Sequence, residues 1–121
     1  MGTVKGDIHD IGKDIVVNML KSAGFEVIDL GVDVPAARFV EALKQSGATV
    51  LGLSGLLTLA FDSMKETIKA VDAAGMRDKV RIMVGGGPVD GNVCTAVGAD
   101  DWGANAQHAV RLAKKWSAAA A

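Results

Sequence analysis

Strand-like and helix-like patterns alternate along the whole 121-residue chain, and this alternation constrains the fold more than any other feature. Apolar residues recur at helical spacing in five segments, and four of these segments are followed by a glycine placed to end a helix: Gly24, Gly47, Gly75 and Gly98. The runs between them are short and apolar, as in buried strands. Such alternation predicts a parallel sheet with helices on both faces.

Five strands are expected, at residues 3–4, 25–30, 49–53, 80–84 and 99–102. Right-handed crossovers then favour a doubly wound α/β fold with a five-stranded parallel sheet. The last helix is expected over 106–116, with a frayed tail behind it. Residues 1–121 are predicted to form one domain. Because the first strand is so short, we expect a fragment whose natural chain continues upstream of it.

Composition excludes several classes of protein. Half of the residues are apolar, 22% are charged and the net charge is -1, which is typical of a globular domain and gives no basic surface for nucleic acid. The apolar runs are interrupted before the roughly 20 residues that span a bilayer, and no signal peptide precedes them. The single Cys94 suits a reducing cytoplasm and is expected in the core. We therefore expect a cytoplasmic protein with no membrane or nucleic-acid partner.

Polar and glycine-rich segments follow the predicted strands. The first is Asp-Ile-His-Asp-Ile-Gly at 7–12, and the others are Ser-Gly-Leu at 54–56, three glycines at 85–87 and Trp-Gly at 102–103. In doubly wound sheets, ligands bind outside the carboxyl ends of the strands. The sequence therefore predicts that these segments meet at one edge of the sheet and bind one large cofactor.

His9 is the candidate metal ligand in the first segment. Asp7 could accept a hydrogen bond from one ring nitrogen, which would leave the other nitrogen to face a metal with a fixed tautomer. Gly12 leaves room for a bulky ligand, and Asp10 is explained as a helix cap. Simpler explanations stay open: a solvated histidine, a helix-capping Ser54 and a triple glycine that is only a loop.

Other doubly wound families fit the segments poorly. A dinucleotide fold requires Gly-x-Gly-x-x-Gly after the first strand, and a flavodoxin requires a hydroxyl-rich phosphate loop there. A response regulator requires a phosphate-accepting Asp where this chain has Ser54, and the residues around Ser54 do not form the Gly-x-Ser-x-Gly turn of a hydrolase. His108 lies among alanines on the last helix and is expected at the surface.

Together, Asp7-x-His9-x-x-Gly12, Ser54-x-Leu56 and Gly85-Gly86 resemble the three-part signature of cobalamin-binding domains, over essentially the whole chain. The resemblance implies a Rossmann- or flavodoxin-like B12-binding fold that holds a cobalamin or related corrinoid base-off. His9 would be the lower axial ligand of cobalt, oriented by Asp7. The other cofactor-binding residues implied are Gly12, Ser54, Leu56, Thr58, Gly85, Gly86, Trp102 and Gly103.

Longer stretches at 7–13, 29–35 and 53–58 look like methyl-transferring corrinoid proteins. The resemblance implies a carrier of methyl groups on cobalt rather than a complete enzyme. Its partners would be methyl-donor and methyl-acceptor methyltransferases and a reductive activase. In related proteins an N-terminal helical bundle caps the upper face of the corrin, and this chain lacks it, so we expect that face to be open.

The chain departs from the pattern of methionine synthase at one position. That protein carries a hydroxyl residue six positions after the serine of Ser-x-Leu, where this chain has Ala60, so the resemblance does not extend the hydrogen-bond chain past Asp7. The alternative function is the B12 domain of an adenosylcobalamin-dependent mutase. A B12-based sensor and a flavodoxin-like domain without cofactor are two further alternatives. The sequence identifies neither the methyl donor nor the acceptor.

Overall fold

The computed structural model describes residues 1–6, 11–55, 60–86, 89–103 and 105–120. Its strands are β1 (Gly2–Thr3), β2 (Val50–Ser54), β3 (Arg81–Gly85) and β4 (Asp101–Gly103). They form one parallel sheet in the order β1-β2-β3-β4. The predicted α/β class and parallel sheet are confirmed.

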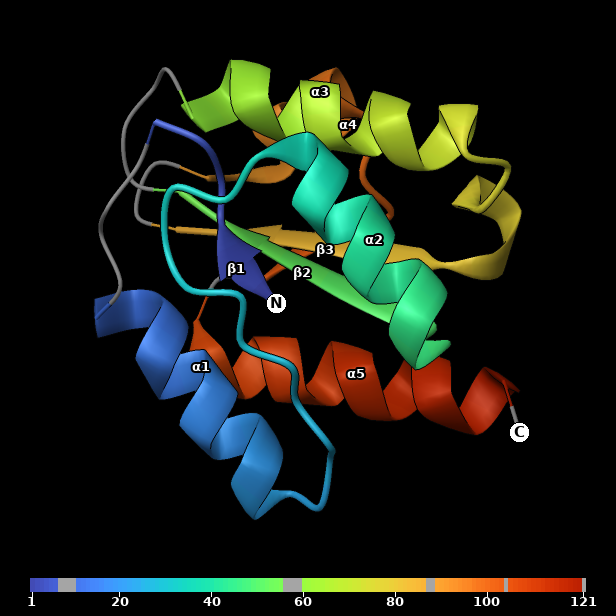
Figure 1. Cartoon of the computed structure of the whole chain (residues 1–121). Coiled ribbons are helices and arrows are strands. Elements are labelled where there is room, and N and C mark those ends of the chain that lie inside the picture. Colours follow the sequence, from blue (N-terminus) through green and yellow to red (C-terminus); the bar gives the residue numbers. More distant parts are fainter. Residues whose placement is uncertain (7–10, 56–59, 87–88, 104, 121) are drawn as a thin grey trace.

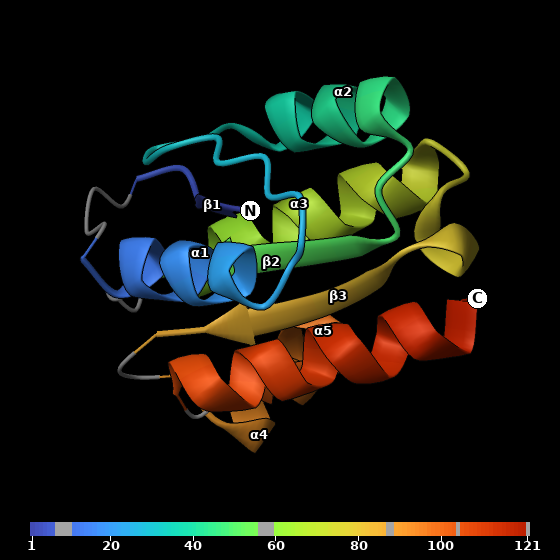
Figure 2. The same cartoon turned by 90° about the horizontal axis from the view of Figure 1, so that it is seen from below.

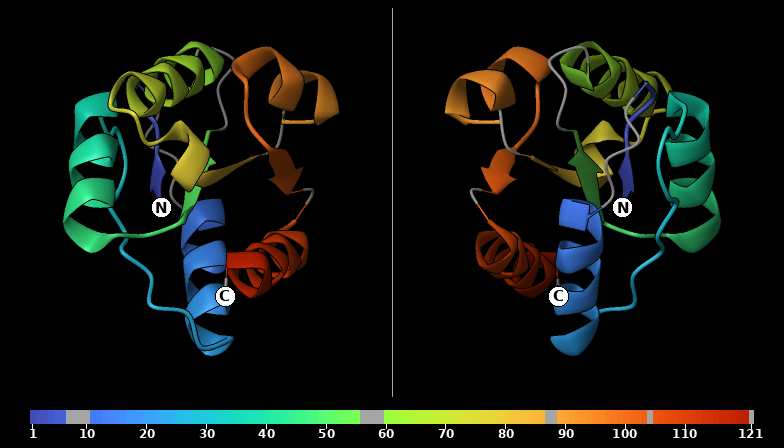
Figure 3. Two further views of the ribbon diagram at one scale, coloured as in Figure 1. Left: turned by 90° about the vertical axis from the view of Figure 1, so that its right-hand side faces the viewer. Right: turned by 90° about the vertical axis from the view of Figure 1, so that its left-hand side faces the viewer.

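Helices cover both faces of this sheet. The helices are α1 (Ile11–Ser22), α2 (Ala36–Ser46), α3 (Ala60–Ala73), α4 (Gly91–Val97) and α5 (Ala106–Ala120), with a 3-10 turn η1 at Arg77–Lys79. Figure 1 shows α2, α3 and α4 on one face and α1 and α5 on the other. Figure 2 looks onto the α1–α5 face, and Figure 3 shows the sheet edge-on between the two layers.

Each face of the sheet has its own hydrophobic core. The larger core joins alternate strand residues such as Leu53, Ile82 and Val84 to α2, α3 and α4. The smaller core joins Met83 to α1 and α5, through Leu20, Leu112 and Ala113 among others. Cys94 is buried in the larger core, as predicted. The pKa of its thiol is raised, mainly by burial and to a lesser extent by the negative charges of Asp101 and Asp100.

The prediction of five strands is wrong, since the described residues form four. Segment 25–30 runs along the free side of β1 instead, where the Leu30 N–H donates to the Met1 carbonyl at 2.8 Å and the Thr3 N–H donates to the Gly31 carbonyl at 2.9 Å. Among the described residues, its neighbour in the sheet is the two-residue β1, and Gly31 (φ 90°) then turns the chain out of the extended conformation. A regular ladder therefore has too few consecutive partners to form.

The predicted helix ends are largely confirmed. Gly47 and Gly98 adopt left-handed conformations, and their N–H groups donate to carbonyls of the last turns of α2 and α4. The last helix is longer than the predicted 106–116, because α5 continues to Ala120. Alanine has the highest intrinsic helix propensity, which explains the extension. No helix among the described residues is long and apolar enough to cross a membrane.

Candidate functional site

A row of small residues crosses the sheet at the carboxyl ends of its strands. Ser54 on β2 lies in register with Gly85 on β3, and Gly85 lies in register with Gly103 on β4. Side chains alternate along a strand, so Ser54 and Gly85 share a face with Met83, the face toward α1 and α5. Three neighbouring strands thus present little more than backbone and one hydroxyl.

A cavity of about 520 Å³ lies over this row, between the sheet and the first turns of α1 and α5. The smaller core fills the space between the sheet and the later turns of the same helices, through Leu20 and Leu112, so the cavity begins where that core ends. Six predicted cofactor-binding residues line it: Gly12, Ser54, Gly85, Gly86, Trp102 and Gly103. A second cavity of about 110 Å³, beside segment 25–30, contains none of them.

Glycines in the cavity wall serve two different purposes. Among the described residues, a Cβ at Gly12 would meet no atom within 4 Å, and one at Gly85 would meet only the Gly103 carbonyl oxygen at 3.8 Å. A Cβ at Gly86 (φ 138°) would instead overlap the carbonyl oxygen of Gly55. Gly86 is therefore required by the protein's own backbone, whereas side chains at Gly12 and Gly85 would only reduce the open space.

Most polar side chains in the cavity wall already have protein partners. Lys13 pairs with Asp29 at 2.8 Å, Asp90 caps α4 by accepting from the Val93 N–H at 3.0 Å, and Asn105 caps α5 by accepting from the His108 N–H at 2.9 Å. The remaining surface is mainly apolar or backbone. Such a wall suits the flat, mainly apolar part of a ligand, and the open space at Gly12 and Gly85 would accept the aromatic base of a corrinoid's nucleotide tail.

Trp102 connects the cavity to α4 and α5. Its indole nitrogen lies 3.5 Å from the position of a Cβ at Gly91, and its ring meets His108 edge to face, with centroids 6.4 Å apart. His108 is half-buried, so its expected place at the surface is only partly correct. The helical alanines around it gave no signal of this aromatic contact.

Other predicted site residues lie outside the described residues: Asp7, His9, Asp10, Leu56 and Thr58. Cobalt ligation by His9 therefore stays a prediction. In the part of the chain that the structure describes, no three His, Cys, Asp or Glu side chains gather into a possible metal site. Ala60, where methionine synthase has a hydroxyl, is fully buried in the larger core.

Four polar residues near segment 7–10 were missed from the sequence. Lys13 is 3% exposed and binds Asp29, Asp33 accepts from the Gly6 N–H at 2.7 Å, and the Ser63 hydroxyl donates to the Lys5 carbonyl at 2.7 Å. Burial alone lowers the pKa of Lys13, but the carboxylates of Asp14 and Asp29 outweigh it and the net shift is upward. Asp29 and Asp33 lie within the stretch 29–35 that resembles corrinoid proteins, and this was the available signal.

Comparison with known proteins identifies the family. Residues 1–111 match the model of the B12 binding domain. The dimethylamine corrinoid protein 1 of Methanosarcina mazei is 48% identical over 114 residues, which cover 94% of this chain and 53% of that protein. The chain thus spans about half the length of this relative.

Two solved structures share the fold closely. A cobalamin-binding protein from Desulfitobacterium hafniense DCB-2 superposes with a TM-score of 0.93 at 49% identity, over 95% of this chain and 56% of the other. The methanol:cobalamin methyltransferase complex MtaBC from Methanosarcina barkeri gives a TM-score of 0.90 at 31% identity, over 97% of this chain and 45% of the other. The chain belongs to the B12-binding domain family, whose cofactor is cobalamin or a related corrinoid.

Proposed function

We propose that this chain holds a corrinoid base-off, with His9 as the lower axial ligand of cobalt, and carries a methyl group between partner methyltransferases. The observation that supports this most is the shared cavity: six residues predicted from the sequence, on four separate segments, line it together. When bound, the corrinoid supplies the cobalt centre on which the methyl group travels.

The chain's own residues would seat and orient the cofactor. The backbone at Gly85 and Gly103 would lie against the nucleotide tail, and the Ser54 hydroxyl would hydrogen-bond the base of that tail. Gly12 would leave room where α1 begins. Asp7 would hold one nitrogen of His9, so that the other faces the metal.

The relatives favour a methyl carrier over a mutase. One is a dimethylamine corrinoid protein, and another belongs to a methanol:cobalamin methyltransferase complex. By this likeness the partners would be a methyl-donor and a methyl-acceptor methyltransferase. A reductive activase is proposed from the resemblance of the sequence alone. The donor would be a simple methylated compound such as a methylamine or methanol.

Ligation by His9 can be tested with hydroxocobalamin. The purified chain is loaded, desalted and reduced to the Co(II) form, and its electron paramagnetic resonance (EPR) spectrum is recorded with unlabelled and with ¹⁵N-histidine-labelled protein. If histidine coordinates cobalt, the splitting of the EPR lines by one axial nitrogen should change from a triplet to a doublet on labelling. A triplet that survives labelling would mean that the dimethylbenzimidazole still binds cobalt.

The two histidines of the chain provide a matched pair of variants. We expect His9→Gly to lose the histidine-dependent splitting and His108→Gln to keep it. Methyl carriage is tested separately, by loading with methylcobalamin and measuring methyl transfer to a thiol by a corrinoid-dependent methyltransferase. Turnover of a carbon-skeleton substrate with adenosylcobalamin would support the mutase instead.

A further inference from the structure

We infer that segment 29–34 acts as a clamp on the residues that flank segment 7–10, with Asp29 and Asp33 as positioning residues for His9. The inference rests on the proposed function, since it gives the segment a role in cobalt ligation. It explains why this segment, which forms no regular strand with β1, still carries two carboxylates directed at the residues on either side of 7–10.

The first arm of the clamp is Asp33. Its side chain accepts a hydrogen bond of 2.7 Å from the N–H of Gly6, the last described residue before segment 7–10. Asp33 adopts a left-handed conformation with φ 51°, the only such non-glycine residue found in the described chain. Aspartate tolerates this conformation better than most residues, and it places the carboxylate beside the bridge between Val4 and Val34.

The second arm is Asp29, which binds Lys13 just after segment 7–10. The Lys13 ammonium lies 2.8 and 2.9 Å from the two carboxylate oxygens, and its side chain is 4% exposed. One of these oxygens also accepts from the Gly31 N–H at 2.9 Å, so Asp29 is itself held in place. A buried ammonium with a fixed carboxylate partner ties the first turn of α1 to segment 29–34.

A third contact holds Lys5, upstream of segment 7–10, from the opposite helix layer. The Ser63 hydroxyl on α3 donates to the Lys5 carbonyl at 2.7 Å. Lys5, Gly6 and Lys13 are thus each held by a side chain remote in sequence. Holding the residues on both sides of segment 7–10 would lower the conformational entropy that His9 loses when it binds cobalt, and such pre-organisation increases affinity.

The test uses two variants of Asp33. Asp33→Gly permits the left-handed backbone but removes the acceptor, whereas Asp33→Asn keeps an acceptor oxygen and tolerates the same backbone. We expect Asp33→Gly to weaken hydroxocobalamin binding about tenfold and Asp33→Asn to restore it to within about threefold. In the protein without cofactor, amide hydrogen exchange over residues 5–13 should accelerate in Asp33→Gly and return toward the wild-type rate in Asp33→Asn.

Asp100→Asn, at the opposite end of the sheet, is the control for general loss of stability. Equal affinity and equal exchange in wild type and Asp33→Gly would overturn the inference, as would a loss of affinity in Asp100→Asn as large as that in Asp33→Gly. If Asp33→Gly does not fold, Asp29→Asn tests the second arm by the same two measurements. The exchange experiment needs no cofactor, so it tests the clamp separately from cobalt ligation. If amide exchange over residues 5–13 responds to the Asp33 variants as expected but the loaded wild type shows no ¹⁵N-sensitive splitting in its EPR spectrum, the proposed ligation is contradicted and the clamp is not.

Discussion

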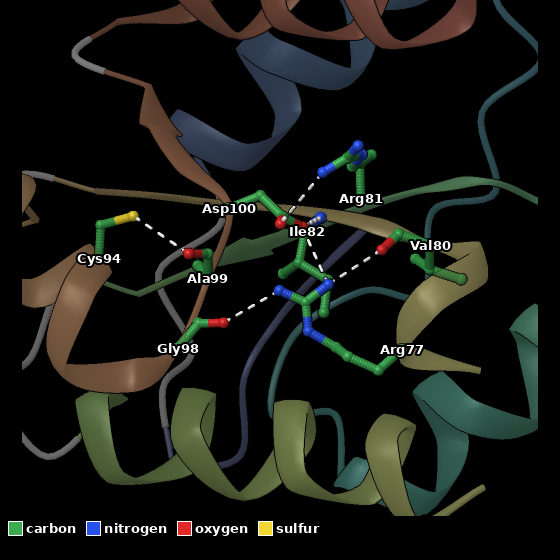
Figure 4. A network of polar contacts seen from close by, with 8 residues as sticks. All are labelled: Arg77, Val80, Arg81, Ile82, Cys94, Gly98, Ala99 and Asp100. Carbon is green, nitrogen blue, oxygen red and sulfur yellow. Dashed lines mark hydrogen bonds and ion pairs between the residues drawn. The ribbon is translucent and has the colours of Figure 1, made fainter. Parts of the chain in front are cut away.

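The two ends of the sheet differ in how their polar groups and space are used. At the amino end of β3, Arg77 donates to the Val80 and Gly98 carbonyls and pairs with Asp100, each at 3.0 Å, and Asp100 also accepts from the Ile82 N–H at 2.8 Å (Figure 4). At the carboxyl end, the row from Ser54 to Gly103 faces a cavity of about 520 Å³. One end uses its polar groups within the protein, and the other leaves space open.

This difference separates residues that serve folding from residues that serve a ligand. A substitution at the amino end should lower stability and leave the affinity of the folded protein for cobalamin unchanged. A substitution that only reduces the cavity should lower affinity without lowering stability. Some glycines at the carboxyl end serve folding and others leave space for a ligand, so substitutions of these glycines test the difference most directly.

The largest effect is expected at Gly86, which belongs to the first class although it lines the cavity. In Gly86→Ala the new Cβ would overlap the Gly55 carbonyl oxygen, and φ 138° is a region that L-residues rarely adopt. We expect the free energy of unfolding to fall by about 3 kcal/mol or more, measured by urea denaturation without cofactor.

The adjacent Gly85 is the matched control. In Gly85→Ala the new Cβ would meet only the Gly103 carbonyl oxygen at 3.8 Å, so stability should be unchanged or slightly raised while hydroxocobalamin affinity falls. Equal destabilisation by the two variants would contradict the distinction between these glycines.

The next largest effect is expected at the amino end. Asp100→Asn removes the charge shared by Arg77 at 3.0 Å and Arg81 at 3.6 Å, although the amide oxygen can still accept from the Ile82 N–H. Because the side chains of Arg77 and Asp100 are about four-fifths buried, we expect a loss of about 1.5–3 kcal/mol in urea denaturation. Under conditions where the variant is folded, its affinity for hydroxocobalamin should equal that of wild type.

Much of the carboxyl end was predictable because its signals are local. Ser54, Gly85 and Gly103 each end a strand, and parallel strands bring such positions to one edge, so residues far apart in sequence could be assigned to one site. The predicted helix ends succeeded for the same reason. A glycine at Gly47 or Gly98 acts on the turn directly before it.

The features that were missed depend on partners distant in sequence. Asp33 and Gly6 are 27 positions apart, and Lys5 and Ser63 are 58 apart, so no local pattern joins them. Segment 25–30 has apolar and β-branched residues typical of a strand, but its conformation depends on how many residues β1 offers it. The role of Gly86 also required the structure, because only the fold brings it against Gly55.

A substitution at Gly12 should change stability and cofactor affinity in opposite directions. In Gly12→Ala the new methyl group would meet no described atom within 4 Å, and alanine favours helix over glycine, so the free energy of unfolding should rise by about 0.5–1 kcal/mol. The same methyl group would enter the space expected for the corrinoid, so hydroxocobalamin affinity should fall about tenfold by steric overlap. Urea denaturation and a spectroscopic titration measure the two effects, and a gain in both would show that α1 does not border the ligand.

The smallest effect is expected in how the Lys13–Asp29 pair makes the free energy of unfolding depend on pH. Burial alone raises the pKa of Asp29, but hydrogen bonds from Lys13 and from the Gly31 N–H outweigh it and hold the pKa below its ordinary value of 3.8. A depressed carboxyl pKa contributes stability that is fully present above 3.8 and is lost as the pH falls through the lower value of the folded state. The difference in unfolding free energy between wild type and Asp29→Asn should therefore be constant from pH 5 to 8, as read from urea denaturation at each pH, and should narrow in acid.

Because Lys13 keeps Asp14 as a second partner at 2.9 Å, we expect the neutral-pH difference to be about 1 kcal/mol. A difference that instead widened below pH 4 would mean that Asp29 is stabilised in its protonated form and does not hold the start of α1 by its charge.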